Sequence, residues 1–159
     1  SKSFSLYGER VGALSIVTES ADERARVTSQ VKRVIRTNYS NPPTHGGSIV
    51  ATILASADLR AQWESELAHM RVRIKAMREG LVSRLNERMK SLGIARDFSF
   101  IAEQKGMFSY SGLTTQQVHY MREHAGIYAI DSGRICLAAV NDDNIDNVAN
   151  AMADAIVNA

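Results

Sequence analysis

Apolar positions in the first third of the chain change from a continuous run to helical spacing. Residues 11–18 are mostly apolar and rich in β-branched side chains, which predicts a strand covered on both faces. A capping box at Ser20–Glu23 then opens a helix whose apolar residues recur at helical spacing up to about Arg36. Asn41-Pro42-Pro43 ends this helix, and residues 48–56 are apolar enough to predict a short buried helix.

One long amphipathic pattern begins at Ala57. Apolar residues at steps of three and four continue to Leu92, so we expect a single helix about 50 Å long at a rise of about 1.5 Å per residue. A helix of that length usually bridges two packed bodies or lies across an interface. Gly80 is a candidate position for a bend, because glycine is unfavourable inside a helix.

Shorter elements follow Gly93. The pattern predicts strands at 98–102 and 107–110, a helix from a Thr114–Gln117 capping box to a Gly126 stop, strands at 127–130 and 134–138, and a last helix capped by Asn141 or Asp142. This order of strands and helices predicts an α+β layer for the second half.

Composition narrows the class of protein without pointing to a function. The chain has 159 residues, of which 45% are hydrophobic and 23% charged, as in ordinary soluble globular proteins. A formal charge of +2 is too small to indicate a nucleic-acid or membrane partner, and no apolar run reaches the roughly 18–20 residues of a membrane span. Cys136 is the single cysteine, which fits a reducing compartment and hence the cytoplasm. The four histidines lack the spacing of metal ligands, so we expect no metal.

Two basic residues near the start are the first candidates for chemistry. Lys2 lies shortly before a predicted core element, where partial desolvation makes an amine a nucleophile. Arg10 offers a planar fork for a phosphate group. The residues alone also fit simpler interpretations, in which Lys2 is a solvated chain end and Arg10 pairs with Glu9 or another acid.

Four segments together resemble one enzyme family. Lys2 to Gly12, Lys-Ser-Phe-Ser-Leu-Tyr-Gly-Glu-Arg-Val-Gly, resembles the cofactor-lysine signature of class I pyridoxal-phosphate aminotransferases. Asn38–Pro43, Gly106–Ser109 and Ser132–Arg134 resemble the same family in the same order. The similarity runs end to end and is greatest to the aspartate and aromatic amino-acid branch.

The resemblance implies an α/β fold, the C-terminal part of a fold-type I pyridoxal-phosphate-dependent transferase. Residues 1–56 would be the end of the large cofactor-binding domain, with the tail of its sheet, the cofactor lysine and a subunit-interface loop. Residues 57–159 would be a long linking helix and a small α+β domain. Most of the large domain, including the groups that hold the cofactor ring, would lie upstream, so we expect the isolated chain to be poorly active.

The resemblance also implies roles for individual residues on the cofactor side. Lys2 would bind pyridoxal 5′-phosphate covalently and move a proton between the substrate α-carbon and the cofactor. Arg10 would hold the cofactor phosphate. Arg36 would bind the distal carboxylate of a dicarboxylate in the active site of the other subunit of a homodimer. Ser40 and Asn41 would belong to the same subunit-crossing loop.

On the substrate side, the resemblance implies that Arg134 grips the α-carboxylate and that Phe108 packs beside the substrate. The residues alone leave alternatives open, since Arg134 between two strands also fits a structural salt bridge and Phe108 also fits a plain core aromatic.

The function implied is transfer of an amino group between aspartate or an aromatic amino acid and 2-oxoglutarate. Segment 5–10 is more similar to the aromatic enzymes and segment 38–43 to the aspartate enzymes, so the preferred donor stays open. Alternatives are an inactive truncated product acting as an interaction module, or another class I enzyme such as a carbon–sulfur lyase or decarboxylase.

Overall fold

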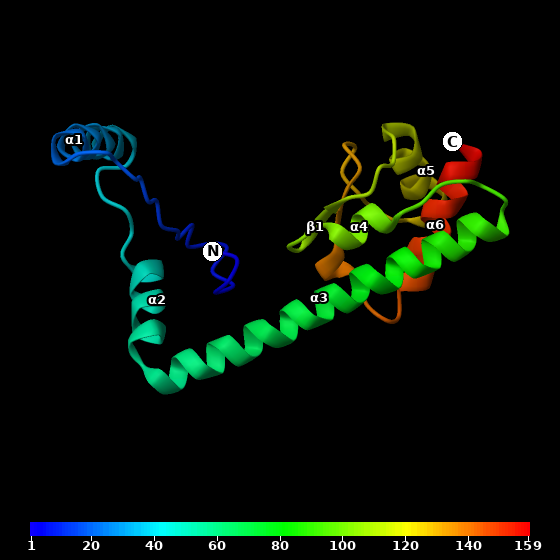
Figure 1. The fold of residues 1–159 in the computed structure, drawn as a ribbon, viewed down its shortest axis with the longest axis horizontal. Coiled ribbons are helices and arrows are strands. Elements are labelled where there is room, and N and C mark those ends of the chain that lie inside the picture. The colour runs from blue at the N-terminus through cyan, green and yellow to red at the C-terminus, as the bar shows by residue number, and fades with distance from the viewer. The chain divides into compact units, whose positions relative to one another are not determined.

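The computed structural model describes residues 1–159, and Figure 1 shows the elements in chain order. The helices and strands are α1 (Ala21–Asn38), α2 (His45–Ala55), α3 (Ala57–Ser91), α4 (Ser99–Glu103), β1 (Phe108–Tyr110), α5 (Thr115–Ala125), β2 (Arg134–Cys136), the 3₁₀ turn η1 (Leu137–Ala139) and α6 (Ile145–Asn158). The chain forms two compact units, Ser1–Leu67 and Ala68–Ala159, whose boundary lies within α3. The division of the chain into functional domains at residues 56 and 57 stays a prediction.

Local capping determines where α1 begins. The Ser20 hydroxyl accepts a hydrogen bond from the Glu23 N–H at 3.1 Å, as the capping box predicts. The Glu23 carboxylate accepts from the Glu19 N–H at 2.8 Å instead of from the cap residue itself. The helix then runs to Asn38, two residues beyond the predicted end.

The predicted strand at residues 11–18 is wrong. This segment has no regular secondary structure, and Leu14 and Val17 are 77% and 98% exposed. A strand exists only where another strand completes its ladder of hydrogen bonds, and no segment of this chain pairs with it. The helix predicted within 48–56 forms as α2, but the expected burial is wrong, because Gly46 is its only buried residue.

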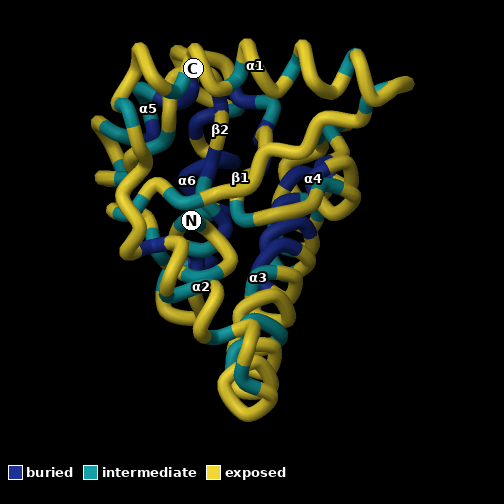
Figure 2. Tube along the Cα trace, turned by 90° about the vertical axis from the view of Figure 1, so that its left-hand side faces the viewer, coloured by how far each residue is buried: buried dark blue, intermediate teal, exposed yellow.

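The core of the chain lies in the second unit. The C-terminal half of α3 buries one face between Met77 and Met89, as the dark-blue tube of Figure 2 shows. The packed cluster also takes side chains from α4, α5, β2 and α6. The long predicted helix is confirmed, and it continues through Gly80. A Cβ at Gly80 would lie 3.1 Å from Cδ1 of Ile145, so glycine here allows α3 and α6 to pack closely.

The sheet is smaller than the sequence predicts. β1 and β2 form one antiparallel pair, with Phe108 opposite Cys136, Ser109 opposite Ile135 and Tyr110 opposite Arg134. The strand predicted at 127–130 is wrong, and the one predicted at 134–138 ends at Cys136. The α+β character of this unit is confirmed, since helices pack around the two strands.

The strand predicted at 98–102 is also wrong, because most of this segment lies in α4 (Ser99–Glu103). Asn86 Oδ1 accepts from the Phe98 N–H at 2.8 Å, and the Asp97 carboxylate accepts from the Ser99 N–H at 3.0 Å. These bonds satisfy backbone donors at the start of a helix and favour α4 over a strand.

The predicted caps of α5 are both present. Thr114 and Gln117 form the reciprocal capping box, and Gly126 ends the helix with a φ of 64°. Asn141 accepts from the N–H groups of Asp143 and Asn144, just before α6 starts at Ile145. No helix of this chain combines the length and apolarity that crossing a bilayer requires.

Candidate functional site

Lys2 lies on a tightly turned loop of residues 1–11. The Leu6 N–H donates to the Ser1 carbonyl at 2.8 Å, and the Ser5 N–H donates to the Lys2 carbonyl at 3.1 Å. Ser5 and Arg10 have φ angles of 53° and 49°, which non-glycine residues rarely adopt. Such strain costs about 1–3 kcal/mol per residue and clusters at functional sites.

The Lys2 amine and the Arg10 guanidinium both contact Tyr7. Lys2 Nζ lies 5.0 Å from the centre of the Tyr7 ring, and Arg10 Nη1 donates to the Tyr7 carbonyl at 3.3 Å. Both side chains are exposed, and the ion pair between Arg10 and Glu9 that the sequence left open is absent. One loop thus presents an amine and a guanidinium, neither of them neutralised by an acid.

Trp63 on α3 holds this loop, and the sequence analysis missed it. Its indole N–H donates to the Ser3 carbonyl at 2.7 Å, and its ring stacks on Phe4 with centres 4.5 Å apart and planes at 7°. The residues on the C-terminal side of Lys2 are therefore attached to a helix. Trp63 is the only tryptophan of the chain, but only the structure reveals a contact across sixty residues.

Arg36 lies in the last turn of α1, and Ser40 and Asn41 directly follow the helix. Arg36 Nη1 donates to the Ser40 hydroxyl, and the Asn41 N–H donates to the Tyr39 carbonyl at 2.8 Å. Ser40 has a φ of 67°, a third strained non-glycine residue in the first unit. The structure thus places the three predicted residues in one turn, and Arg36 forms no ion pair within the chain.

Arg134 and Phe108 meet across the two-stranded sheet. Arg134 Cζ lies 5.1 Å from the centre of the Phe108 ring, a cation–π contact. Arg134 is exposed and forms no ion pair within this chain, so the structure shows no salt bridge at this residue. Phe108 is 42% exposed, so it is not a plain core aromatic. The guanidinium is left available for a carboxylate from outside the chain.

The turn before Arg134 depends on a glycine at position 133 and on ion pairs of Asp131. Gly133 has a φ of 79°, and a Cβ there would lie 2.7 Å from the Leu113 carbonyl oxygen, so only glycine fits. Asp131 pairs with His119 at 3.3 Å and with Arg122 at 3.1 Å. Hydrogen bonding by His119, followed by the contribution of Arg122, holds the pKa of Asp131 below its ordinary value. No sequence motif marks His119 or Arg122 as a partner of Asp131.

No group of three or more histidine, cysteine, aspartate or glutamate side chains has the arrangement of a metal site. A shallow groove of about 390 Å³ lies elsewhere in the second unit, lined by Asn86, Lys90, Ile94, Ala95, Arg96 and Asp97. None of the predicted site residues lines it.

Comparison with known proteins agrees with the resemblance. The family model for aminotransferase class I and II matches residues 1–152. The aspartate aminotransferase of Pseudomonas aeruginosa is 61% identical over 152 residues, which are 96% of this chain and 37% of that protein. The aromatic-amino-acid aminotransferase of Escherichia coli is 47% identical over 153 residues, 96% of this chain and 38% of that protein.

A solved structure shows the same similarity. The aromatic-amino-acid aminotransferase from Burkholderia pseudomallei, covalently bound to pyridoxal phosphate, superposes with a TM-score of 0.83 at 68% identity. The match covers 97% of this chain and 38% of that one, so the chain spans less than two fifths of the length of these relatives. The predicted resemblance and fold class are confirmed, and the chain belongs to the class I and II aminotransferase family.

Proposed function

We propose that this chain is part of a pyridoxal-phosphate-dependent aminotransferase that exchanges an amino group between aspartate or an aromatic amino acid and 2-oxoglutarate. Because the chain spans 37% of the length of its aspartate aminotransferase relative, the activity belongs to a polypeptide that also contains the rest. The observation that carries the proposal is the loop on which the Lys2 amine and the Arg10 guanidinium both contact Tyr7.

The chemistry of these side chains fits the cofactor. A primary amine condenses with an aldehyde, and a guanidinium binds a phosphate dianion through two parallel hydrogen bonds. Neither group is neutralised by an acid of this chain. When bound, pyridoxal phosphate supplies an electron sink that makes the substrate α-proton removable.

Lys2 and Arg10 have different proposed roles toward the cofactor. Arg10 holds the phosphate and so fixes the position of the cofactor against the loop. Lys2 would hold the cofactor through its amine, and when that amine is free its Nζ would take the proton from the substrate α-carbon and deliver it to the cofactor within the same half-reaction. The stacking of Trp63 on Phe4 limits the movement of the backbone beside Lys2.

Arg134 orients the substrate. Its planar fork binds the α-carboxylate through two hydrogen bonds, which restricts rotation of the substrate and directs the α-proton toward a base. Phe108 lies beside the guanidinium, with Cζ of Arg134 5.1 Å from the centre of its ring. An arginine that already lacks an acidic partner loses no internal ion pair when a carboxylate arrives.

The proposal extends to a homodimer. α1 buries none of its residues within this chain, and Arg36 at its C-terminal end is exposed, so the helix is free to pack on a second subunit. In that arrangement Arg36, with Ser40 and Asn41, serves the partner's site and binds a distal carboxylate. We further propose that residues 1–56 belong to the cofactor-binding domain, residues 57–159 to the small domain, and the enzyme to the cytoplasm.

The test is an amino-transfer assay on the complete polypeptide that contains these residues, with 2-oxoglutarate as acceptor and aspartate or phenylalanine as donor. We expect formation of glutamate that depends on added pyridoxal phosphate. Absence of transfer from every donor would refute the proposal. Release of ammonia or carbon dioxide without glutamate would instead favour a lyase or a decarboxylase.

A further inference from the structure

Arg78 is a buried arginine without an acidic partner. It lies on the buried face of α3, where the residue is 6% exposed, and every ion pair of the chain involves other residues. Burial lowers the pKa of the Arg78 guanidinium, because desolvation disfavours the charged form. Burying a cation without a carboxylate costs more than burying an apolar side chain of the same size. Packing alone therefore does not explain an arginine at this position.

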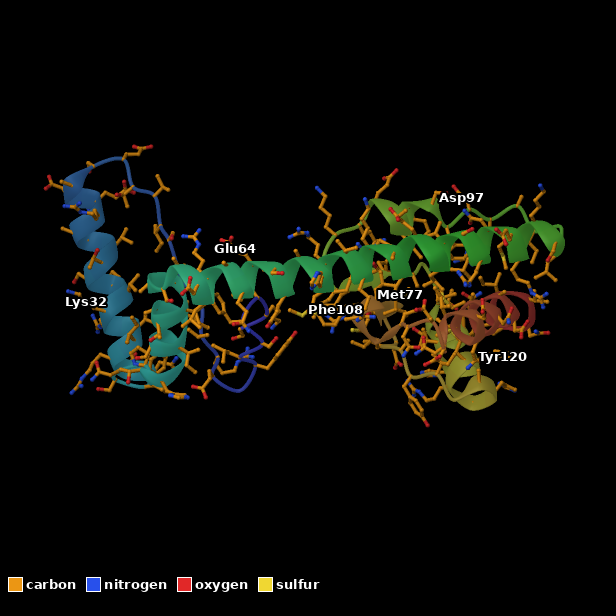
Figure 3. All side chains as sticks on the ribbon, turned by 90° about the horizontal axis from the view of Figure 1, so that it is seen from below. Lys32, Glu64, Met77, Asp97, Phe108 and Tyr120 are labelled. Atoms are coloured by element: carbon orange, nitrogen blue, oxygen red, sulfur yellow. The ribbon has the colours of Figure 1, made fainter.

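The Arg78 guanidinium holds the chain on both sides of Phe108. Its Nη2 donates to the Gly106 carbonyl at 2.5 Å and to the Ser109 hydroxyl at 3.4 Å, while its Nε has no partner. Gly106 lies two residues before Phe108, and Ser109 directly follows it. Figure 3 labels Phe108 and also Met77, the neighbour of Arg78 in the chain.

These contacts continue to Arg134. Phe108 and Ser109 belong to β1, a strand of three residues whose only partner is β2. A two-stranded sheet of this size is marginally stable by itself, so its position depends on outside contacts. Arg134 lies on β2, and its guanidinium rests on the Phe108 ring. Movement of β1 would therefore move the surface on which Arg134 lies.

We propose that Arg78 is a positioning residue for substrate binding. By holding Gly106 and Ser109 it keeps the Phe108 ring against Arg134, and so sets the direction in which Arg134 meets the substrate carboxylate. This inference rests on the proposed role of Arg134 in binding the substrate carboxylate. The experiment below distinguishes a failure of that role from a failure of the positioning role of Arg78.

The test uses the complete, cofactor-loaded enzyme with Arg78→Met, which keeps most of the side-chain volume and removes both hydrogen bonds. The matched control is Arg73→Met, since Arg73 on the same helix donates to the carbonyls of Ala138 and Val140, beyond β2, at 2.8 and 2.9 Å. The readouts are KM and kcat for aspartate, and the Kd of succinate, a dicarboxylate that cannot react, by calorimetry.

We expect Arg78→Met to raise KM and the succinate Kd about tenfold, with kcat within about threefold, and Arg73→Met to leave KM and Kd within about twofold. An equal rise in both variants, or an unchanged KM in Arg78→Met, would overturn the inference. If Arg78→Met does not fold, Arg78→Lys and Arg73→Lys replace the pair. A lysine lacks the planar fork, so we expect KM to rise about threefold for Arg78→Lys alone, and no rise overturns the inference.

Arg134→Leu distinguishes the two proposals. If it leaves KM and the succinate Kd unchanged, the proposed role of Arg134 fails, and the role of Arg78 fails with it. If Arg134→Leu raises both constants while Arg78→Met does not, only the positioning role of Arg78 fails.

Discussion

The two units of the chain differ in how they hold their candidate residues. In residues 1–67 Gly46 is the only buried residue, and three non-glycine residues, Ser5, Arg10 and Ser40, have positive φ angles. In residues 68–159 a packed core surrounds α3, and every positive φ angle belongs to glycine. The proposed cofactor residues lie in the first unit and the proposed α-carboxylate residues in the second.

This difference indicates where the stability of each part comes from. Apolar burial of roughly 25 cal/mol per Å² stabilises the second unit from within. The first unit exposes apolar side chains such as Leu14, Ile16 and Val17, which in isolation contribute little. Strained residues persist only where surrounding structure holds them. We therefore expect the cofactor side to need contacts from outside this chain, and the substrate side to form its own scaffold.

The largest effect should follow from removing the proposed catalytic amine. In the complete enzyme, we expect Lys2→Ala to lower the rate of transamination by about 10⁴-fold, because it removes both the attachment of the cofactor and the base. Steady-state assays measure this, with Lys32→Ala, an exposed lysine of α1, as the matched control. Comparable losses in both variants would place the catalytic amine elsewhere.

The difference in packing predicts unequal effects of one substitution in the two units. Leu85→Ala removes a fully buried side chain and should lower the free energy of unfolding by about 2–5 kcal/mol. Leu14→Ala, at a position 77% exposed, should change it by less than about 0.5 kcal/mol in this chain. Urea denaturation followed by circular dichroism measures both. A large effect of Leu14→Ala would show that the first unit has a core of its own.

Arg36 tests whether the exposed end of α1 serves a substrate. We expect Arg36→Ala to lower kcat/KM for aspartate about 100-fold and to change that for phenylalanine much less, because only aspartate has a distal carboxylate. Arg33→Ala, an exposed arginine of the same helix, should leave both unchanged within about twofold. Equal losses for the two donors in Arg36→Ala would argue against a distal-carboxylate role.

The smallest effect concerns the turn before Arg134. The pKa of Asp131 is lowered in the folded chain, so its interactions stabilise the fold above the ordinary aspartate pKa and are lost as pH falls through the lowered value. Asp131→Asn should therefore lower Tm slightly at pH 7, and the difference from the unmodified chain should shrink below about pH 4. Thermal scans across pH measure it, with the exposed Asp142→Asn as control. A difference that persists unchanged at low pH would contradict this account.

Elements with local signals could be predicted from the sequence. Ser20 caps α1, Thr114 and Gln117 cap α5, and Gly126 ends α5, because each signal acts within five residues. Strands were predicted less well, since a strand depends on a partner that local sequence does not reveal. Residues 11–18 have no partner strand in this chain. Residues 98–102 overlap the helix α4, whose start is favoured by Asn86, twelve residues before Phe98, accepting the Phe98 N–H.

The residues of the candidate site also fall into two groups, those that a local motif identifies and those that only the folded structure reveals. Lys2, Arg10 and Arg134 lie in short motifs and Arg36 lies two residues before one, so the resemblance identified them, although their roles stay proposals. Trp63 and Arg78 lie in no motif. Trp63 reaches Ser3 across sixty residues and Arg78 reaches Ser109 across thirty-one, and such contacts arise only in the folded chain.

The most direct test of the account is reductive trapping of pyridoxal phosphate with borohydride on the complete polypeptide, followed by peptide mapping. The account predicts a single labelled residue, Lys2, and loss of that label in Lys2→Ala but not in Lys32→Ala. Label spread over several surface lysines, or label retained in Lys2→Ala, would contradict the assignment of Lys2 as the cofactor lysine.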